Sequence, residues 1–171
     1  MREPCRGVSL GVQMIGDIGP EHYPHILKIN SEFVYWLSPL NEARLKWILE
    51  RATYARQIKE AQAILIGYGH DVDYPNHKNI AWLSNHVENF FYIERIIIDI
   101  ASQGRGFGRR LYEDVEAFAA ARGYTNLACE VNTVPNNPGS HKFHQALGYI
   151  TLGDVDYPAH GAALRYYAKQ I

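Results

Sequence analysis

The chain has 171 residues, of which 47% are hydrophobic and 20% are charged, and its formal net charge is −1. This length and composition suit one sizeable core, so we expect a single domain over residues 1–171. The balanced charge provides no basic field for a phosphate backbone, which excludes nucleic acid as the main partner. No apolar stretch approaches the roughly 20 residues of a membrane-spanning helix, so no membrane partner is expected.

The N-terminus and the cysteines narrow the class of protein further. The opening residues MREPCRGVSLGVQ contain no apolar stretch typical of a secretory signal, so a cytoplasmic protein is expected. Cys5 and Cys129 predict neither a disulfide framework nor a thiolate metal site, and Cys129 lies in an apolar run that predicts a buried free thiol. Pairs of histidines stand three residues apart, but no further ligands follow at suitable spacing, so no metal is expected.

The first half of the chain predicts short helices and strands. The expected elements are a strand over residues 8–15, helices over 21–29 and 45–53, and a hairpin of residues 54–58 and 63–68. The connection over residues 69–89 carries a brief helical pattern around 80–83. Connections of this length inside a compact domain are usually functional or mobile, so we expect a functional role here.

The second half alternates strands and helices. Residues 90–100 form the clearest strand, and their isoleucine run predicts burial on both faces. An amphipathic helix follows and is expected to end at Gly123. A strand over 126–131, a helix over 138–147 closed by Gly148, and a strand pair over 149–155 and 163–168 complete the expected elements. This order predicts an α/β or α+β domain with one central sheet.

A glycine-rich turn, QGRGFGR at residues 103–109, joins the clearest strand to the amphipathic helix. Glycines allow a ligand to approach the backbone closely, and the free N–H groups of a helix N-terminus attract an anion. The pattern therefore indicates a phosphate site, and a tight turn without a ligand is the alternative. Arg109 stands where the dinucleotide fingerprint needs its third glycine, and no P-loop lysine follows, which disfavours a nucleotide-binding regulator.

The same turn resembles a known family. Gln103, Gly106 and Gly108 match Q-x-x-G-x-G, the motif by which the GNAT N-acetyltransferase superfamily holds the pyrophosphate of acetyl-CoA. IIID at residues 96–99 and CEVN at 129–132 resemble the fourth and fifth strands of that family, and NPGSHKFHQALGY its following helix. The resemblance is specific over residues 90–155. It implies one domain with a central mixed, mostly antiparallel, splayed sheet of six to seven strands, flanked by about four helices.

The resemblance also implies a function. It implies an acetyl-CoA-dependent N-acetyltransferase that acts on a primary amine of a small molecule or a protein. The alternative function is a non-catalytic acyl-CoA-binding or sensing module of the same fold. The residues implied to bind the cosubstrate acetyl-CoA are Ile96, Ile97, Ile98, Ile100, Gln103, Gly104, Arg105, Gly106, Phe107, Gly108, Arg109 and Asn137.

Two carboxylates are candidates for the general base that acetyl transfer to an amine requires. Glu94 lies four residues before Ile98, so strand alternation predicts that both side chains share a face. Its position resembles that of the base in some members, including the serotonin N-acetyltransferases. Glu130 resembles the base of the ribosomal-protein alanine N-acetyltransferases. A water chain without a single base, or a salt bridge from either carboxylate to Arg95 or Arg122, are the alternatives.

His144 is the candidate proton donor to the departing thiolate. It stands seven residues after Asn137, where many family members carry a tyrosine. An imidazole with an ordinary pKa of about 6.5 donates only while protonated, so the hypothesis predicts that activity begins to fall between roughly pH 6.5 and 7.5. In the alternative, His144 only packs and solvent protonates the thiolate.

Three connections are implied to grip the acceptor, over residues 30–40, 71–89 and 156–161. Their aromatic and histidine content suits a flat or apolar amine, and a homodimer contact is the alternative role. These side chains are Phe33, Tyr35, Trp36, Tyr74, His77, Tyr157 and His160.

Overall fold

A computed structural model describes residues 14–171, and most of the strand expected over residues 8–15 lies outside this range. In chain order the elements are β1 (Ile15–Asp17), η1 (Pro20–His22), α1 (Tyr23–Glu32), α2 (Glu42–Arg51), β2 (Tyr54–Ile58), β3 (Ala63–Gly69), α3 (Lys78–Leu83), β4 (Phe90–Ile98), η2 (Ile100–Ser102), α4 (Phe107–Ala121), β5 (Asn126–Val134), α5 (Pro138–Ala146), β6 (Ile150–Tyr157), η3 (Pro158–His160) and β7 (Ala162–Gln170). The helices and strands expected after residue 20 are all present, within a few residues of their predicted bounds.

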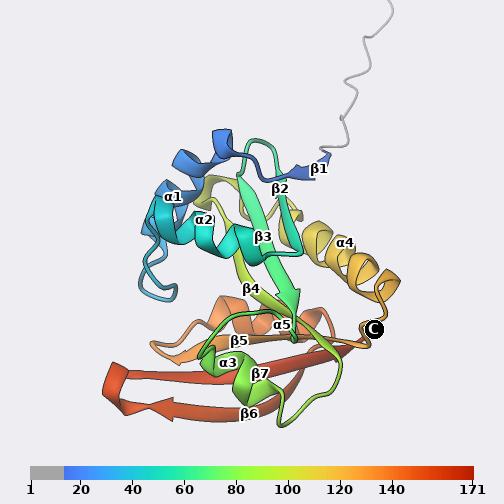
Figure 1. Cartoon of the computed structure of the whole chain (residues 1–171). Helices are drawn as coiled ribbons and strands as arrows, with labels where there is room; N and C mark the ends of the chain where they lie inside the picture. The colour runs from blue at the N-terminus through green and yellow to red at the C-terminus, as the bar shows by residue number, and fades with distance from the viewer. Residues whose placement is uncertain (1–13) are drawn as a thin grey trace, which may run out of the picture.

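The strands form one sheet of seven in the order β1-β2-β3-β4-β5-β7-β6. Every neighbouring pair is antiparallel except β4 and β5, which run parallel. The expected mixed, mostly antiparallel sheet within a single α/β domain is therefore confirmed. Figure 1 shows β1, β2 and β3 with α1, α2 and α4 above, and β5, β6 and β7 with α3 and α5 below, while β4 runs between the two parts.

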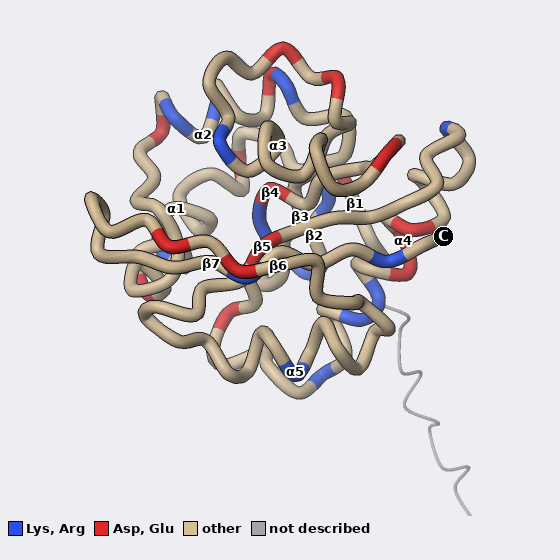
Figure 2. The backbone as a smooth tube through the Cα atoms, turned by 90° about the horizontal axis from the view of Figure 1, so that it is seen from below, with Lys and Arg blue, Asp and Glu red and all other residues tan. Residues whose placement is uncertain are grey.

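Helices cover both faces of the sheet. One core cluster packs α4 and Phe143 of α5 against the strands, while a second places Ile26 and Ile48 of α1 and α2 on the opposite face. A third cluster adds Leu83 of α3 to that second face, beneath Tyr166 of β7. Figure 2, seen from below, shows α5 on one side of the β6–β7 hairpin and α3 on the other, with Lys, Arg, Asp and Glu interspersed along the chain.

Burial along β4 differs from the prediction. Residues 90–93 are buried on both faces, but from Glu94 to Ile98 buried and half-buried residues alternate. The strand also ends at Ile98, two residues earlier than expected, and Ile100 lies in η2 with 60% of its surface exposed. The prediction that the isoleucine run is buried on both faces is therefore wrong, because this half of the strand has a neighbour on one edge only.

The parallel strands β4 and β5 form a fork. They pair only at Phe90↔Asn126, Phe91↔Leu127 and Tyr92↔Ala128. Beyond these pairs β4 continues with β3, and β5 continues with β7, so the two halves of the sheet diverge. The edges of the fork carry backbone groups without a strand partner, which is the arrangement an extended ligand needs to hydrogen-bond between them.

A β-bulge at Glu94 lies just past the closed part of the fork. Ile93 pairs with Gly67 and Arg95 with Ile66, so Glu94 is the extra residue on β4. A Cβ on Gly67 would come within 2.7 Å of the Tyr92 carbonyl oxygen, so only glycine allows the strands to approach this closely. The prediction that Glu94 and Ile98 share a face is wrong, because the bulge breaks the alternation: Ile98 packs against the α4 cluster, whereas Glu94 accepts a hydrogen bond from Tyr68 in the cluster on the other face.

Candidate active site

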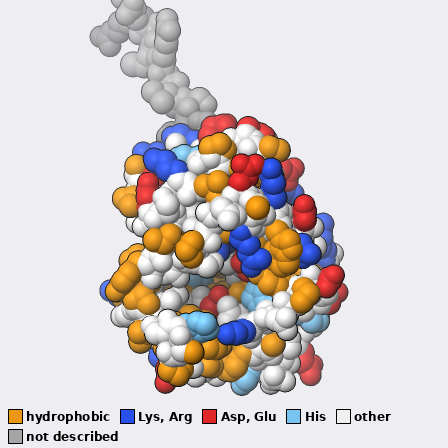
Figure 3. All heavy atoms as spheres, turned by 60° about the vertical axis from the view of Figure 1, so that its left-hand side comes forward, with side chains coloured by type: hydrophobic (Ala, Val, Ile, Leu, Met, Phe, Trp, Pro, Cys, Tyr) orange, Lys and Arg blue, Asp and Glu red, His pale blue; other side chains and the backbone are white. Residues whose placement is uncertain are grey.

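The open part of the fork is the floor of a cavity of about 900 Å³. Figure 3 shows this face of the molecule hollowed, with acidic side chains inside the hollow and Lys, Arg and His side chains near its rim. The cavity brings together fourteen of the fifteen candidate residues from the sequence; Arg105 does not line it. Those that line it are Glu94, Ile96, Ile97, Ile98, Ile100, Gln103, Gly104, Gly106, Phe107, Gly108, Arg109, Glu130, Asn137 and His144.

The glycine-rich turn is shaped to hold an anion. Gly104 and Gly106 have φ angles of +77° and +76°, and a Cβ on either would meet no atom within 4 Å, so both face open space. Gly106 is the N-cap of α4 and has no side chain to accept from the first-turn N–H groups. Gly108 is packed instead, because a Cβ there would lie 2.9 Å from Ile98 Cδ1. The turn therefore combines a close backbone approach with the positive end of a 15-residue helix.

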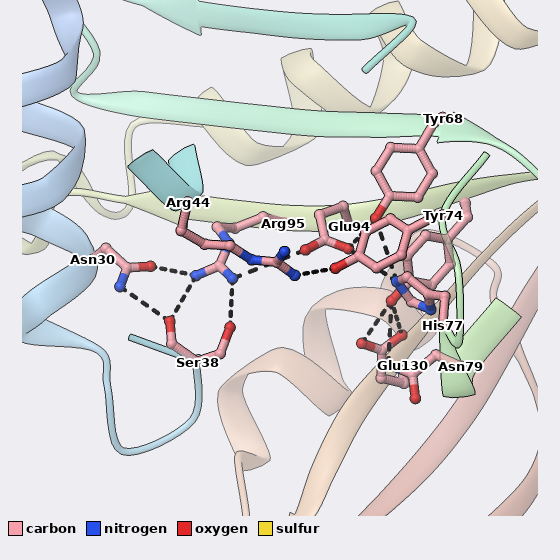
Figure 4. A network of polar contacts seen from close by, with 11 residues as sticks. Asn30, Ser38, Arg44, Tyr68, Tyr74, His77, Asn79, Glu94, Arg95 and Glu130 are labelled. Carbon is pink, nitrogen blue, oxygen red and sulfur yellow. Dashed lines mark hydrogen bonds and ion pairs between the residues drawn. The ribbon is translucent and has the colours of Figure 1, made fainter. Parts of the chain in front are cut away.

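Glu94 and Glu130 stand opposite each other across the fork. The last parallel pair is Tyr92↔Ala128, and each carboxylate follows two residues later on its own strand. Ala128 and Tyr92 belong to the same core cluster, so both carboxylates lie on the sheet face that carries α3. The sequence alternatives for the base are thus side by side, and Figure 4 shows them in one polar network.

Glu94 is engaged by three neighbours. Its Oε2 accepts a hydrogen bond from Tyr68 and lies 3.3 Å from His77 Nε2, while its Oε1 lies 4.0 Å from a guanidinium nitrogen of Arg95. The Glu94 side chain is only 9% exposed. The ion pair with Arg95 that the sequence offered as an alternative is present at this long distance, whereas Arg122 stacks on Phe118 instead.

Glu130 has a simpler environment. Both of its carboxylate oxygens lie 2.9 Å from the Tyr92 hydroxyl, which donates to them. Burial raises the pKa of Glu130 to about 8, and the hydrogen bond from Tyr92 opposes that rise. A carboxyl with such a pKa changes its protonation close to neutral pH, as a general base requires.

Arg95 ties the sheet to the connection between α1 and α2. Its guanidinium donates to Asn30 Oδ1, to the Ser38 carbonyl at 3.1 Å and to Ser38 Oγ at 2.7 Å. Two residues before Ser38, Trp36 lines the cavity, and its Nε1 donates to the Asn136 carbonyl at 3.0 Å. Hydrogen bonds thus tie this connection both to β4 and to the segment before α5.

His144 is buried in the wall between α4 and α5, with 2% of its surface exposed. Its Nδ1 lies 2.8 Å from the Ser140 carbonyl, so Nδ1 carries the proton and Nε2 accepts from the Tyr112 hydroxyl, also at 2.8 Å. Burial lowers the pKa of His144 to about 4. The sequence hypothesis assumed an ordinary pKa; that assumption is wrong, and the early alkaline fall in activity is no longer expected.

Apart from Arg95, sequence reasoning did not identify the partners of the carboxylates, although it named His77 as a residue near the acceptor. Tyr68, His77 and Tyr92 surround Glu94 and Glu130, and Asn79 donates to Tyr92 at 3.3 Å. A signal existed for Tyr92 alone, since it stands two residues before Glu94 on the same strand. The other partners come from β3 and the segment before α3, and local pattern does not reveal such long-range contacts.

Residues 14–171 give no support for a reactive thiol, a metal site or a membrane-spanning helix. Cys129 is buried and free, as predicted, and burial raises the pKa of its thiol well above the usual range. No group of three or more His, Cys, Asp or Glu side chains in this range could hold a metal ion. None of its helices is long and apolar enough to cross a membrane.

Known structures share this architecture. The ribosomal-protein-S18-alanine N-acetyltransferase of Escherichia coli is 17% identical with a TM-score of 0.67, and the match covers 93% of this chain and 94% of that one. Ard1 of Thermoplasma volcanium is 11% identical with a TM-score of 0.73, covering 92% and 97%. The protein yncA of Salmonella typhimurium, solved with acetyl-CoA, is 16% identical with a TM-score of 0.67, covering 92% and 93%.

Sequence comparison identifies the family. No curated protein is similar enough in sequence to match the chain. The model of the acetyltransferase (GNAT) family, however, matches residues 25–149, which contain the fork, the glycine-rich turn and both carboxylates. The match spans well over half of the chain, and the chain therefore belongs to the GNAT acetyltransferase family.

Proposed function

We propose that the protein is an acetyl-CoA-dependent N-acetyltransferase that transfers the acetyl group to a primary amine of a small molecule or a protein. The observation that carries this proposal is the fork, where an anion-binding turn and two carboxylates border one cavity. Acetyl-CoA supplies an activated thioester. The residues present fit it, because Gly104 and Gly106 leave open space for a pyrophosphate and β4 offers an unpaired edge to an extended amide-bearing chain.

Glu130 is the general base in this proposal, in place of Glu94, which the sequence favoured. Glu94 is already committed to Tyr68 and His77. Glu130 contacts Tyr92, is half-buried at the cavity, and has a pKa near 8. Glu130 removes one proton from the acceptor ammonium, and the neutral amine then attacks the thioester carbonyl and forms the C–N bond. The nitrogen gives its second proton to solvent, the C–S bond breaks, and solvent protonates the departing thiolate.

The neighbouring carboxylate has a separate task. Glu94 stays hydrogen-bonded while Glu130 exchanges its proton, so a cationic acceptor meets negative charge at the fork before it is deprotonated. Trp36 and Phe33, which line the cavity from the α1–α2 connection, provide the apolar contact surface for that acceptor.

Offering acetyl-CoA with a panel of primary amines tests the proposal. We expect release of free CoA thiol that depends on the amine, together with stabilisation of the protein against melting by acetyl-CoA. The matched control is Glu130→Gln, which should keep the stabilisation and lose most of the thiol release. Stabilisation by acetyl-CoA without thiol release from any amine would instead identify a binding or sensing module of the same fold.

A further inference from the structure

A chain of hydrogen bonds runs from Glu130 away from the cavity to the β6–β7 hairpin. Tyr92 donates to Glu130 at 2.9 Å, and Asn79 Nδ2 lies 3.3 Å from the Tyr92 hydroxyl. On the other side of Asn79, its Oδ1 accepts from Tyr166 at 2.8 Å, and Tyr166 is 2.8 Å from the hydroxyl of Tyr157 at the end of β6. The chain joins four structural elements, β4, α3, β7 and β6, to one carboxylate. Figure 4 shows Asn79 beside Glu130 at the start of this chain.

The donors in this chain all point the same way. Tyr166 has one proton and gives it to Asn79, so its oxygen accepts from Tyr157. The Asn79 amide group then presents its N–H to the Tyr92 oxygen, which leaves the Tyr92 proton for the carboxylate. An anion accepts only, so the ionised form of Glu130 is the natural end of a chain with this direction.

Reversal of the chain would require several coordinated changes. A protonated Glu130 that donates to Tyr92 would send the Tyr92 proton toward Asn79, which would have to turn its carbonyl oxygen to that side. Tyr166 would then lose its acceptor and have to reorient toward Tyr157. Tyr92 and Tyr166 are 1% and 0% exposed, so water offers no replacement partner during such a change.

We propose that Tyr92 and Asn79 are positioning residues that orient Glu130 and favour its anionic, proton-accepting form. This inference rests on the proposed function, because it concerns the base of that reaction. Neither residue touches the acetyl group or the acceptor amine in this proposal; both act through the carboxylate. Asn79 relays orientation and not protons, since an amide does not pass a proton along the chain.

Groups outside the hydrogen-bond chain also affect the ionisation of Glu130. Glu94 opposes its ionisation and Arg95 favours it. The remaining titratable groups that interact with it are Tyr68 of β3, Tyr112 of α4, Cys129 of β5 and Tyr166 of β7, while His77 before α3 packs against Tyr92. Tyr92 alone among the residues described donates a side-chain hydrogen bond to Glu130, so its hydroxyl offers the cleanest change to test.

The primary test is the pH profile of kcat/KM for Tyr92→Phe, which removes one oxygen atom. We expect the acid limb to move about one pH unit upward, so that activity below the limb falls about tenfold while the plateau is kept. Asn79→Leu should move it in the same direction by less, and Tyr166→Phe by less again. The matched control is Tyr54→Phe, which removes a buried hydroxyl that donates to Asp114 at 2.8 Å on the other sheet face and should leave the limb in place.

A second readout does not depend on activity. Titration of carbon-13-labelled glutamate carboxyl groups by NMR, with the Glu130 signal assigned by its loss in Glu130→Gln, should show a higher midpoint in Tyr92→Phe than in the unaltered protein. An unchanged midpoint would overturn the inference even if the enzyme is active. A limb that moves in Tyr68→Phe and not in Tyr92→Phe would also overturn it and identify Glu94 as the base. Absence of all thiol release would count against the proposed function, while the NMR midpoint would still decide on the chain.

Discussion

The two halves of the β4–β5 pair differ in almost every physical respect. Over the closed half, from Phe90 to Tyr92, the strands are hydrogen-bonded to each other and β4 is buried on both faces. Over the open half the strands are no longer paired with each other, and buried and half-buried residues alternate along β4. The open half also contains the charged residues Glu94, Arg95 and Glu130, whereas residues 90–92 of the closed half are aromatic. Two continuous strands therefore build a core at one end and the candidate active site at the other.

The two halves differ in how they accommodate polar groups, and the buried core supplies partners for the carboxylates of the open half. Burying a carboxylate without a hydrogen-bond partner is costly, so the two carboxylates in the open half of the fork need partners. Their hydroxyl partners come from residues that belong to the buried core: Tyr92 from the closed half itself, and Tyr68 from the fully buried strand β3. Hydroxyl groups of the buried core thus hold the two carboxylates in place.

Of all the changes proposed for the open half, removing the carboxylate charge at Glu130 should lower activity most. Glu130→Gln keeps the size of the side chain but cannot take a proton, so we expect kcat/KM to fall by roughly 10² to 10⁴ and its acid limb to disappear. Steady-state kinetics over pH 5 to 9 measure both effects, and calorimetry should find acetyl-CoA affinity little changed. Glu94→Gln is the matched comparison. If it alone abolishes the acid limb, the roles of the two carboxylates are the reverse of those proposed.

The Glu130 carboxyl should also make the free energy of unfolding depend on pH. Because burial raises the pKa of Glu130 to about 8 from its ordinary 4.5, the folded state binds the proton more tightly than the unfolded state. This contribution is complete below about pH 4.5 and is lost as pH rises through about 8. Between pH 6 and 9 the unaltered protein should lose about 2.7 kcal/mol relative to Glu130→Gln, or about 5 to 11 °C in melting temperature. Parallel melting curves would contradict this.

The glycine-rich turn tests whether the ligand uses the open half. Gly106→Val places a branched side chain where the backbone now faces open space, so we expect acetyl-CoA affinity to fall at least tenfold, about 1.4 kcal/mol. Gly123→Val is the matched control, since Gly123 also has a positive φ, +83°, and open space, but lies past the other end of α4. Both variants share the backbone strain, and calorimetry on the folded proteins should show weaker binding in the first alone. Equal affinities would place the ligand elsewhere.

The sequence revealed the turn and the elements because their signals are local. Gly106 and Gly108 stand at a fixed spacing between a β-branched run and an amphipathic pattern, and glycines at 123 and 148 mark helix ends with φ angles of +83° and +89°. The bulge at Glu94 could not be foreseen, because it depends on the register between β4 and Gly67 of β3. The lowered pKa of His144 could not be predicted for a similar reason, because it results from burial by residues that are far away in the sequence.

The smallest effect on activity is expected at His144, which lies at the edge of the open half. The test decides whether this side chain donates a proton to the thiolate or only packs. With a pKa near 4, its imidazole does not change charge between pH 6 and 9, so we expect no fall in activity between pH 6.5 and 7.5. His144→Phe should change kcat by less than about threefold, under 1 kcal/mol. It should still lower stability by about 1 to 3 kcal/mol, because the Tyr112 hydroxyl loses its acceptor. Adding Tyr112→Phe removes that stranded hydroxyl and should restore part of the loss, which separates packing from chemistry. An early alkaline fall that disappears in His144→Phe would instead assign the imidazolium as the donor.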